Sequence, residues 1–373
     1  MDTIQNKKKS RIIFIDLMRA FAVLMMVQGH TIDAFLSDNF RSFDSPVFNF
    51  WNFWRGLTAP IFMFSAGTVF TYLLRLNDEP FFQNPRAWKG VKRFLLLISL
   101  AYLLRWPTPY LFYFGEVTPE QWKNFFVIDV LHLIAFGILF TVLLAYVAEK
   151  FKLRDGLVFG TSAFLFFSLY PWFSNVSWIN YLPEPLTGYF YTGTGSLFPL
   201  FPWVGYILCG AILGSYLAKN PGIFKSPKFS GSLLIIGLAF VALSGIGDRV
   251  EFWLNNESTF WTTSPNLIIF RIGVVLLLNS LVSYLAIKLE NIPPLIIHIG
   301  RSTLPIYVIH LVILFGTPWT VGFYPYFGKS LDVWTSISAA VVMVTLMIAI
   351  VQSVQLIKGF YRKKLAPQKV NTK

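Results

Sequence analysis

Charged side chains are scarce in this sequence. Asp, Glu, Lys and Arg make up only 13% of its 373 residues, whereas apolar residues make up 55%. Soluble globular chains carry roughly 25% charged residues, so this composition excludes an ordinary soluble domain. It predicts an all-α polytopic membrane protein instead.

Cysteine, histidine and the familiar catalytic signatures are also scarce. Cys209 is the only cysteine, which excludes an intramolecular disulfide framework. The sequence contains neither a Gly-x-Ser-x-Gly motif nor a glycine-rich phosphate loop, so nothing indicates a serine hydrolase of that type or a soluble nucleotide domain. No two of the four histidines have the close spacing of a helical metal pair, so we expect no metal site. The histidines are His30, His132, His298 and His310.

Basic residues outnumber acidic ones and give a net charge of +13, but they form short clusters between apolar stretches. There is no long basic arm of the kind that binds nucleic acid. We interpret the clusters as topology signals and as contacts to anionic lipid, and we expect no nucleic-acid partner.

Ten apolar stretches reach the length that spans a bilayer. They lie near 12–35, 50–74, 93–113, 125–148, 156–173, 199–218, 230–247, 266–287, 295–316 and 333–357. With the N-terminus inside, nearly all basic loop residues face the cytoplasm, so both termini are predicted to be cytoplasmic.

The chain is predicted to contain one membrane domain, residues 11–364, between a basic cytoplasmic segment 1–10 and a disordered cytoplasmic tail 365–373. The first apolar stretch contains Asp16 and Arg19 and ends without a small-residue cleavage site. We therefore expect an uncleaved first span. The compact loops favour a bacterial cytoplasmic membrane as the location.

Four polar residues form a stripe on the first predicted helix. At about 100° per residue, Arg19 and His30 lie within roughly 20° of each other and about 16 Å apart in height. Asp16 and Asp33 stand three residues from Arg19 and His30, so each can form a same-face pair. Such a stripe is costly in lipid and is expected to face the bundle interior or a water-filled cavity.

Two interpretations of this stripe remain open. In the first, Asp16 and Arg19 are a structural ion pair, as buried pairs often are, and His30 is a hydrogen-bonded residue at the outer interface. In the second, Asp16, Arg19, His30 and Asp33 are catalytic, with His30 as a general base whose ring Asp33 orients.

All of the stripe except Asp33 lies in a segment, FIDLMRAFAVLMMVQGH at residues 14–30, that resembles the opening of two groups of membrane acyltransferases. These are the heparan-α-glucosaminide N-acetyltransferase catalytic-domain family and the family-3 O-acyltransferases. Residues 59–67 (APIFMFSAG) and 300–310 (GRSTLPIYVIH) are similar to helices of these families, and 199–214 (PLFPWVGYILCGAILG) is similar to the glucosaminide group.

The match is mixed. Ala20 stands where these families usually have glycine, and the Gly29-His30 ending is closer to the O-acyltransferases. Lys89, Lys92 and Arg93 only loosely resemble the double-arginine motif of family-3 proteins. The acceptor atom, oxygen or nitrogen, therefore stays open.

The resemblance implies transfer of an acyl group, commonly acetyl, from cytoplasmic acyl-coenzyme A to an extracytoplasmic glycan or similar acceptor. His30 would be the general base, and a covalent acyl-histidine stays open as an alternative. Arg19 would lie along the pantetheine arm. Basic residues near the cytoplasm would hold the coenzyme A phosphates, namely Lys89, Lys92, Arg93, His298 and Arg301.

Other polar residues in the predicted spans are candidates for the acceptor side. They can bind an acidic sugar or stabilise an oxyanion, or they can be structural groups that pair or snorkel. These candidates are Arg55, Asp129, His132, Arg271 and His310.

Two functions from other classes remain as rivals. Intramembrane Asp, Arg and His also occur in secondary transporters and lipid flippases. A non-catalytic scaffold that keeps the acyltransferase fold is the second rival. For all three, the partners include membrane lipid, and a homo-oligomer stays open.

Overall fold

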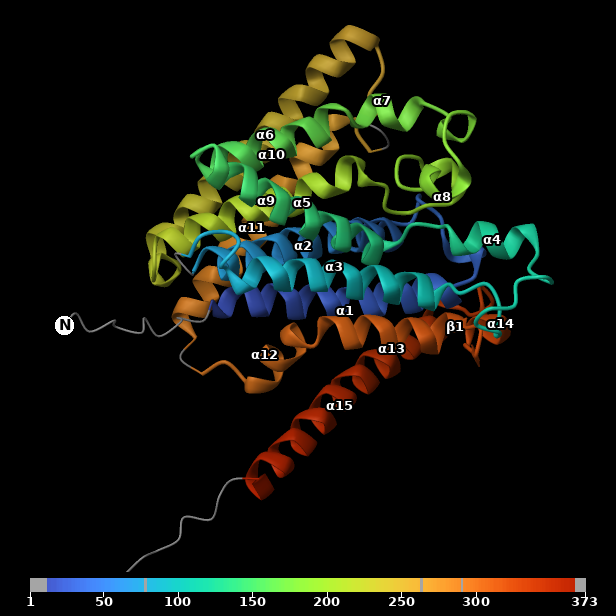
Figure 1. Ribbon diagram of the computed structural model, residues 1–373. Helices are drawn as coiled ribbons and strands as arrows, with labels where there is room; N and C mark the ends of the chain where they lie inside the picture. The colour runs from blue at the N-terminus through green and yellow to red at the C-terminus, as the bar shows by residue number, and fades with distance from the viewer. Residues whose placement is uncertain (1–11, 77–78, 262–263, 290, 366–373) are drawn as a thin grey trace, which may run out of the picture.

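A computed structural model describes residues 12–76, 79–261, 264–289 and 291–365. These residues form helices and loops, with strands limited to the two-residue hairpin of β1 (Gly316–Thr317) and β2 (Thr320–Val321). The all-α prediction is confirmed (Figure 1). The predicted segment 1–10 and the predicted tail 365–373, apart from Leu365 at the end of the last helix, lie outside the described residues.

Eleven helices form the body of the protein. They are α1 (Ile13–Phe35), α2 (Pro46–Arg75), α3 (Pro85–Leu104), α5 (Val130–Lys150), α6 (Asp155–Ser168), α9 (Leu200–Lys219), α10 (Pro227–Asn255), α11 (Pro265–Lys288), α12 (Pro294–Arg301), α13 (Thr303–Phe315) and α15 (Val333–Leu365).

Shorter helices lie in the connections. They are η1 (Asp38–Phe40), α4 (Pro119–Phe125), α7 (Tyr170–Asn175), η2 (Trp178–Asn180), α8 (Glu184–Thr187), η3 (Thr192–Thr194), η4 (Ile223–Lys225) and α14 (Tyr324–Phe327).

Eight helices of the described chain are long and apolar enough to cross a membrane, with α6 and α7 counted as one continuous segment. The pair α12 and α13 makes a ninth if it is one span bent by 72°. A polytopic α-helical membrane protein is therefore confirmed. The remaining predicted span, the third, corresponds to α3, which fails the same test because four basic residues occupy its first half.

The predicted position of this third span, 93–113, is wrong. The helix starts at Pro85, because the Asn84 side chain caps it by accepting from the Arg86 backbone N–H. It ends at Leu104, and the apolar residues that follow form a loop at the other end of the bundle. The basic residues of the first turns lower the local hydropathy, so the predicted span was placed too far toward the C-terminus.

The predicted single span 295–316 is broken. The helix ends at Arg301 and restarts at Thr303, and the bend lies at Ser302. Gly300 permits the close approach of α12 to α1: a Cβ there would lie 2.0 Å from the Asp16 carbonyl oxygen. The break brings the first turn of α13 against the polar stripe of α1.

Helices α2 and α9 also approach closely. A Cβ on Gly210 or Gly214 would lie 1.9 Å and 2.3 Å from backbone carbonyl oxygens of α2. The two glycines are four residues apart, the small-residue spacing that lets membrane helices pack tightly. The sequence segment 199–214 therefore has a packing role.

Helix α1, which carries the polar stripe, has other helices along two of its flanks. Figure 1 shows α1, α2 and α3 running side by side, with α12 and α13 along the opposite flank of α1, and α15 diverging from the bundle.

At the end predicted to be cytoplasmic, Asp155 joins α2, α6 and α9. Its carboxylate lies 2.6 Å from Arg75 Nη2 and 3.1 Å from Lys219 Nζ.

Candidate functional site

Two histidines from distant parts of the chain meet inside the bundle. His30 Nδ1 on α1 lies 3.1 Å from His310 Nε2 on α13, and the ring centroids are 5.3 Å apart. His310 is fully buried, whereas His30 is partly exposed. The sequence singled out both residues but did not pair them.

Asp33 was predicted to orient the His30 ring, but its side chain pairs with arginines. Its Oδ1 accepts hydrogen bonds of 2.8 Å from both Arg41 and Arg55. The carboxylate therefore balances two guanidinium groups one turn beyond His30. Arg55 also stacks over Trp51, with 5.4 Å between the guanidinium carbon and the ring centroid.

The cytoplasmic half of the stripe is held by the α12–α13 break. Arg19 Nη2 donates a 2.9 Å hydrogen bond to Thr303 Oγ1, and Asp16 Oδ2 lies 3.6 Å from Arg301 Nε. Each charged residue of α1 thus has a partner that lies outside α1. The stripe faces protein, as its cost in lipid predicts.

A cavity of about 350 Å³ lies beside this stripe, between α1, α2, α3, α5 and α13. Four of its lining residues are basic: Arg19, Arg86, Lys89 and Arg93. The other walls are almost entirely apolar. They are formed by Phe62, Ala66, Val69, Phe70, Leu73, Leu97, Val130, Leu131, Ile134, Ile138, Thr303, Leu304 and Tyr307.

The cavity crosses much of the bundle. At one end it meets the basic first turns of α3, and at the other end the first turn of α5. Tyr307, part of its wall, has its ring centroid 5.7 Å from that of His310. The cavity therefore runs from the predicted cytoplasmic side to Tyr307, which contacts His310, although neither His30 nor His310 is among its lining residues.

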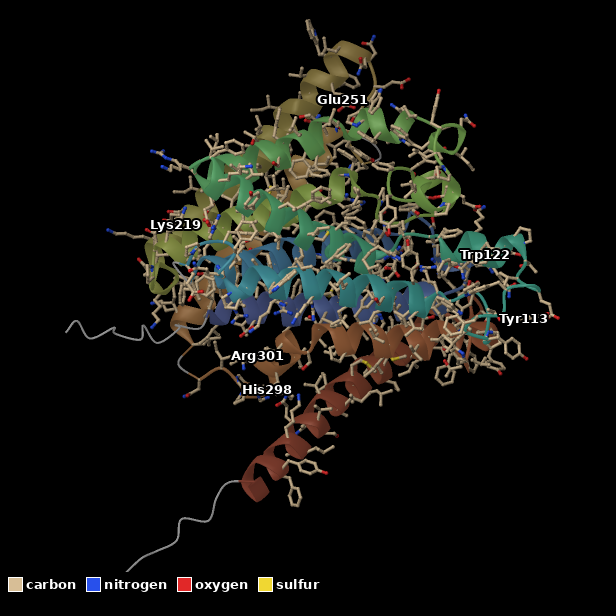
Figure 2. The ribbon with its side chains drawn as sticks, viewed as in Figure 1. Tyr113, Trp122, Lys219, Glu251, His298 and Arg301 are labelled. Carbon is tan, nitrogen blue, oxygen red and sulfur yellow. The ribbon has the colours of Figure 1, made fainter. Side chains whose placement is uncertain are left out.

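The predicted coenzyme A residues divide into two groups. Lys89 and Arg93 line the cavity, whereas Lys92, His298 and Arg301 are absent from its lining. Figure 2 shows His298 and Arg301 together on α12, and Arg301 faces Asp16.

The predicted acceptor-side residues divide as well. Asp129 caps α5 and lies 3.1 Å from His132 Nδ1, so the two form a local pair. Arg105 Nε lies 3.4 Å from the second oxygen of Asp129. Arg271 stacks over Trp203 on α9 and does not line the cavity.

Sequence reasoning missed four polar residues that the fold brings into the site. Arg86 lines the cavity with Lys89 and Arg93. Thr303, Tyr307 and Arg41 are the partners or neighbours of Arg19, His310 and Asp33. The spacing Thr303, Tyr307, His310 repeats every three to four residues and puts them on one helix face, a signal present in the sequence. Nothing local to Arg41 pointed to Asp33.

Within the part of the chain that the structure describes, no group of three or more His, Cys, Asp or Glu side chains could hold a metal ion. The polar groups of the site are instead histidine rings, guanidinium groups and hydroxyls. Such groups can move a proton and bind anionic or carbonyl oxygens.

These features define an integral membrane protein with a buried polar centre and a cavity that is lined by basic residues at one end. The sequence matches the family described as "Heparan-alpha-glucosaminide N-acetyltransferase, catalytic" over residues 11–246, more than half of the chain. The chain belongs to this family, which implies a membrane-bound acetyltransferase. The match ends before α12 and α13. A comparison with curated proteins finds no match.

Proposed function

We propose that this protein transfers an acetyl group from cytoplasmic acetyl-coenzyme A to an amine or hydroxyl of an extracytoplasmic glycan, with His30 as the general base. One observation carries the proposal: a single cavity leads from basic residues of α3 to Tyr307, whose ring lies beside His310. A donor that enters at the α3 end would have its far end beside Tyr307, one side chain away from the histidine pair.

The walls of the cavity suit coenzyme A. Arg86, Lys89 and Arg93 supply positive charge at the end where the nucleotide phosphates would stay. Beyond them, apolar walls suit the thin pantetheine arm, whose amide groups need a few polar partners. Arg19 and Thr303 offer a guanidinium and a hydroxyl at that depth.

The chemistry requires one proton to move twice. His30 removes the proton from the acceptor amine or hydroxyl as its nitrogen or oxygen attacks the thioester carbonyl. The carbon–sulfur bond then breaks, and the imidazolium returns the proton to the coenzyme A thiolate. The products are the acetylated acceptor and free coenzyme A, with His30 unchanged.

The outer end of the stripe suits a polar acceptor. Arg55 and Asp33 are both part-exposed, with 36% and 40% of their side chains accessible, and they lie one turn beyond His30. Together with Arg41 they offer hydrogen-bond donors and an acceptor to sugar hydroxyls. The proposed location of this activity is a bacterial cytoplasmic membrane.

The test compares the detergent-purified parent with His30→Ala in acetyl-coenzyme A binding and in acetyl transfer to glucosamine oligomers. We expect the variant to bind the donor as the parent does and to lose about 10²–10⁴ in turnover, the usual share of a general base. His298→Ala is the matched control, because His298 does not line the cavity, and it should keep full turnover.

Two results would contradict the proposal. If no acyl-coenzyme A binds, the transporter or scaffold functions become the better explanations. If donor binds and transfer survives in His30→Ala, His30 is not the base.

A further inference from the structure

The second ring of the histidine pair has a fixed hydrogen position. His310 Nδ1 lies 2.8 Å from the carbonyl oxygen of Ile306, one turn earlier in α13. A carbonyl oxygen only accepts hydrogen bonds, so Nδ1 must carry the hydrogen. The position of this hydrogen follows from backbone geometry and depends on no other side chain.

That hydrogen determines the rest of the pair. His310 is fully buried, and within the described residues no carboxylate lies within ion-pair distance of it. A buried, uncompensated charge is costly, so the ring is neutral and its Nε2 keeps a lone pair. Since Nε2 lies 3.1 Å from His30 Nδ1, the latter donates and carries the hydrogen of the His30 ring.

We infer that His310 is a positioning residue that holds His30 in its Nδ1–H form and thereby leaves His30 Nε2 as the basic atom. The basic role of Nε2 rests on the proposed function, but the tautomer does not. Nε2 has no hydrogen-bond partner among the described residues, and the ring is partly exposed, so this nitrogen is free to meet a substrate.

The proton balance of transfer then involves His30 alone. The acceptor proton binds Nε2, and the resulting imidazolium strengthens its Nδ1–H hydrogen bond to the neutral Nε2 of His310. The same proton leaves Nε2 for the thiolate. The Nδ1–H of His310 stays hydrogen-bonded to the Ile306 carbonyl oxygen throughout, so His310 orients and stabilises His30 without relaying a proton.

A neutral imidazole thus has the place that a carboxylate has in many catalytic pairs. Asp33 does not have this place, because its Oδ1 accepts from Arg41 and Arg55 and the partner of His30 Nδ1 is His310. His310 also lies outside the segment that matches the acetyltransferase family, residues 11–246, so the pair joins the matched segment to the region beyond it.

The first test is nitrogen NMR of protein labelled with ¹⁵N-histidine in detergent at neutral pH. Only four histidines contribute, and His30→Ala and His310→Gln assign the two rings. We expect a protonated Nδ1 and an unprotonated Nε2 in both His30 and His310. A hydrogen on His30 Nε2 would overturn the inference, whether or not the protein transfers acetyl groups.

The second test uses turnover with acetyl-coenzyme A and glucosamine oligomers. His310→Ala should lower kcat at least about tenfold without changing KM for the donor. His310→Gln should recover much of the loss, because its amide oxygen can accept from His30 Nδ1. Equal activity in the two variants, or a loss confined to KM, would contradict a positioning role.

The tests separate the two proposals. If the NMR result is as expected and no variant or parent transfers acetyl groups, the tautomer stands and the proposed function fails. If His310→Ala does not fold, His310→Gln still tests the ring assignment and the retained activity.

Discussion

The residues of the site come in pairs that join α1 to α13. His30 contacts His310, and Arg19 contacts Thr303. Arg19 and His30 are eleven residues apart on α1, their partners are seven residues apart on α13, and the two pairs follow the same order along both helices. Two helices that run side by side in the same direction give this match. Helix α13 therefore satisfies two of the four polar residues of the α1 stripe, while Asp16 pairs with Arg301 and Asp33 with two arginines, which lowers the cost of burying the stripe.

Arg19 is expected to act on the donor. Arg19→Ala should raise KM for acetyl-coenzyme A by about 10-fold or more, since a hydrogen bond to a charged group contributes about 1.5–3 kcal/mol. KM for the acceptor should stay unchanged. Arg19→Lys should lie between the two, because lysine keeps the charge but loses the planar fork. Steady-state kinetics with each substrate varied decides, and an unchanged donor KM would contradict this role.

Two neighbouring lysines on α3 provide a matched comparison. Lys89 lines the cavity, and Lys92, three residues later, does not. Lys89→Ala should raise the dissociation constant for acetyl-coenzyme A several-fold, about 1 kcal/mol for an exposed charge pair. Lys92→Ala should leave it unchanged. Calorimetric titration at low salt measures both, and equal effects would show that general surface charge, rather than the cavity mouth, attracts the donor.

At the scale of elements, the break between α12 and α13 decides where the site residues lie. A continuous helix would carry Thr303 and His310 along the direction of α12. The bend at Ser302 lets α12 cross close to α1 at Gly300 while α13 runs beside α1. Broken helices in membranes are tolerated where their free backbone groups meet protein or a cavity, and Thr303 lines the cavity.

Gly300 tests this arrangement. Gly300→Ala would place a Cβ 2.0 Å from the Asp16 carbonyl oxygen, so α12 must move away from α1. We expect a loss of about 1–3 kcal/mol in stability, as for other overpacked sites, and a lower Tm in detergent. Gly231→Ala is the control, because nothing lies within 4 Å of its Cβ position. A Tm of Gly300→Ala that equals this control would show that the close contact is unimportant.

At the scale of the whole molecule, the bundle has two chemically different ends. Figure 2 shows Lys219 at one end and Tyr113 with Trp122 at the other. The first end carries the Asp155 ion pairs and the basic turns of α3. The second carries exposed aromatics such as Tyr110, Phe112 and Tyr113, which suit a membrane interface.

This asymmetry predicts an orientation that labelling can check. In a Cys209→Ala background, which removes the only cysteine, Tyr113→Cys should react with a membrane-impermeant maleimide in intact cells. Lys92→Cys should react only after the membrane is permeabilised. Labelling of Lys92→Cys in intact cells would reverse the topology and would place the basic cavity mouth outside, away from cytoplasmic coenzyme A.

The sequence by itself determined the features that depend on one helix at a time. Hydropathy over about 20 residues indicates a spanning helix, and the helical repeat put Arg19 and His30 on one face. It also indicated Lys89 and Arg93 as donor residues. It misplaced α3, because the start of that helix depends on the Asn84 cap, whereas hydropathy averages over basic turns.

Only the tertiary structure decided which groups meet. His30 and His310 are 280 residues apart, and Arg19 and Thr303 are 284 apart. No local pattern encodes such pairs, because they depend on which helices pack together and at what height. The same packing gave Asp33 to two arginines, removed His298, Arg301 and Lys92 from the cavity, and left His310 as the ring that holds His30.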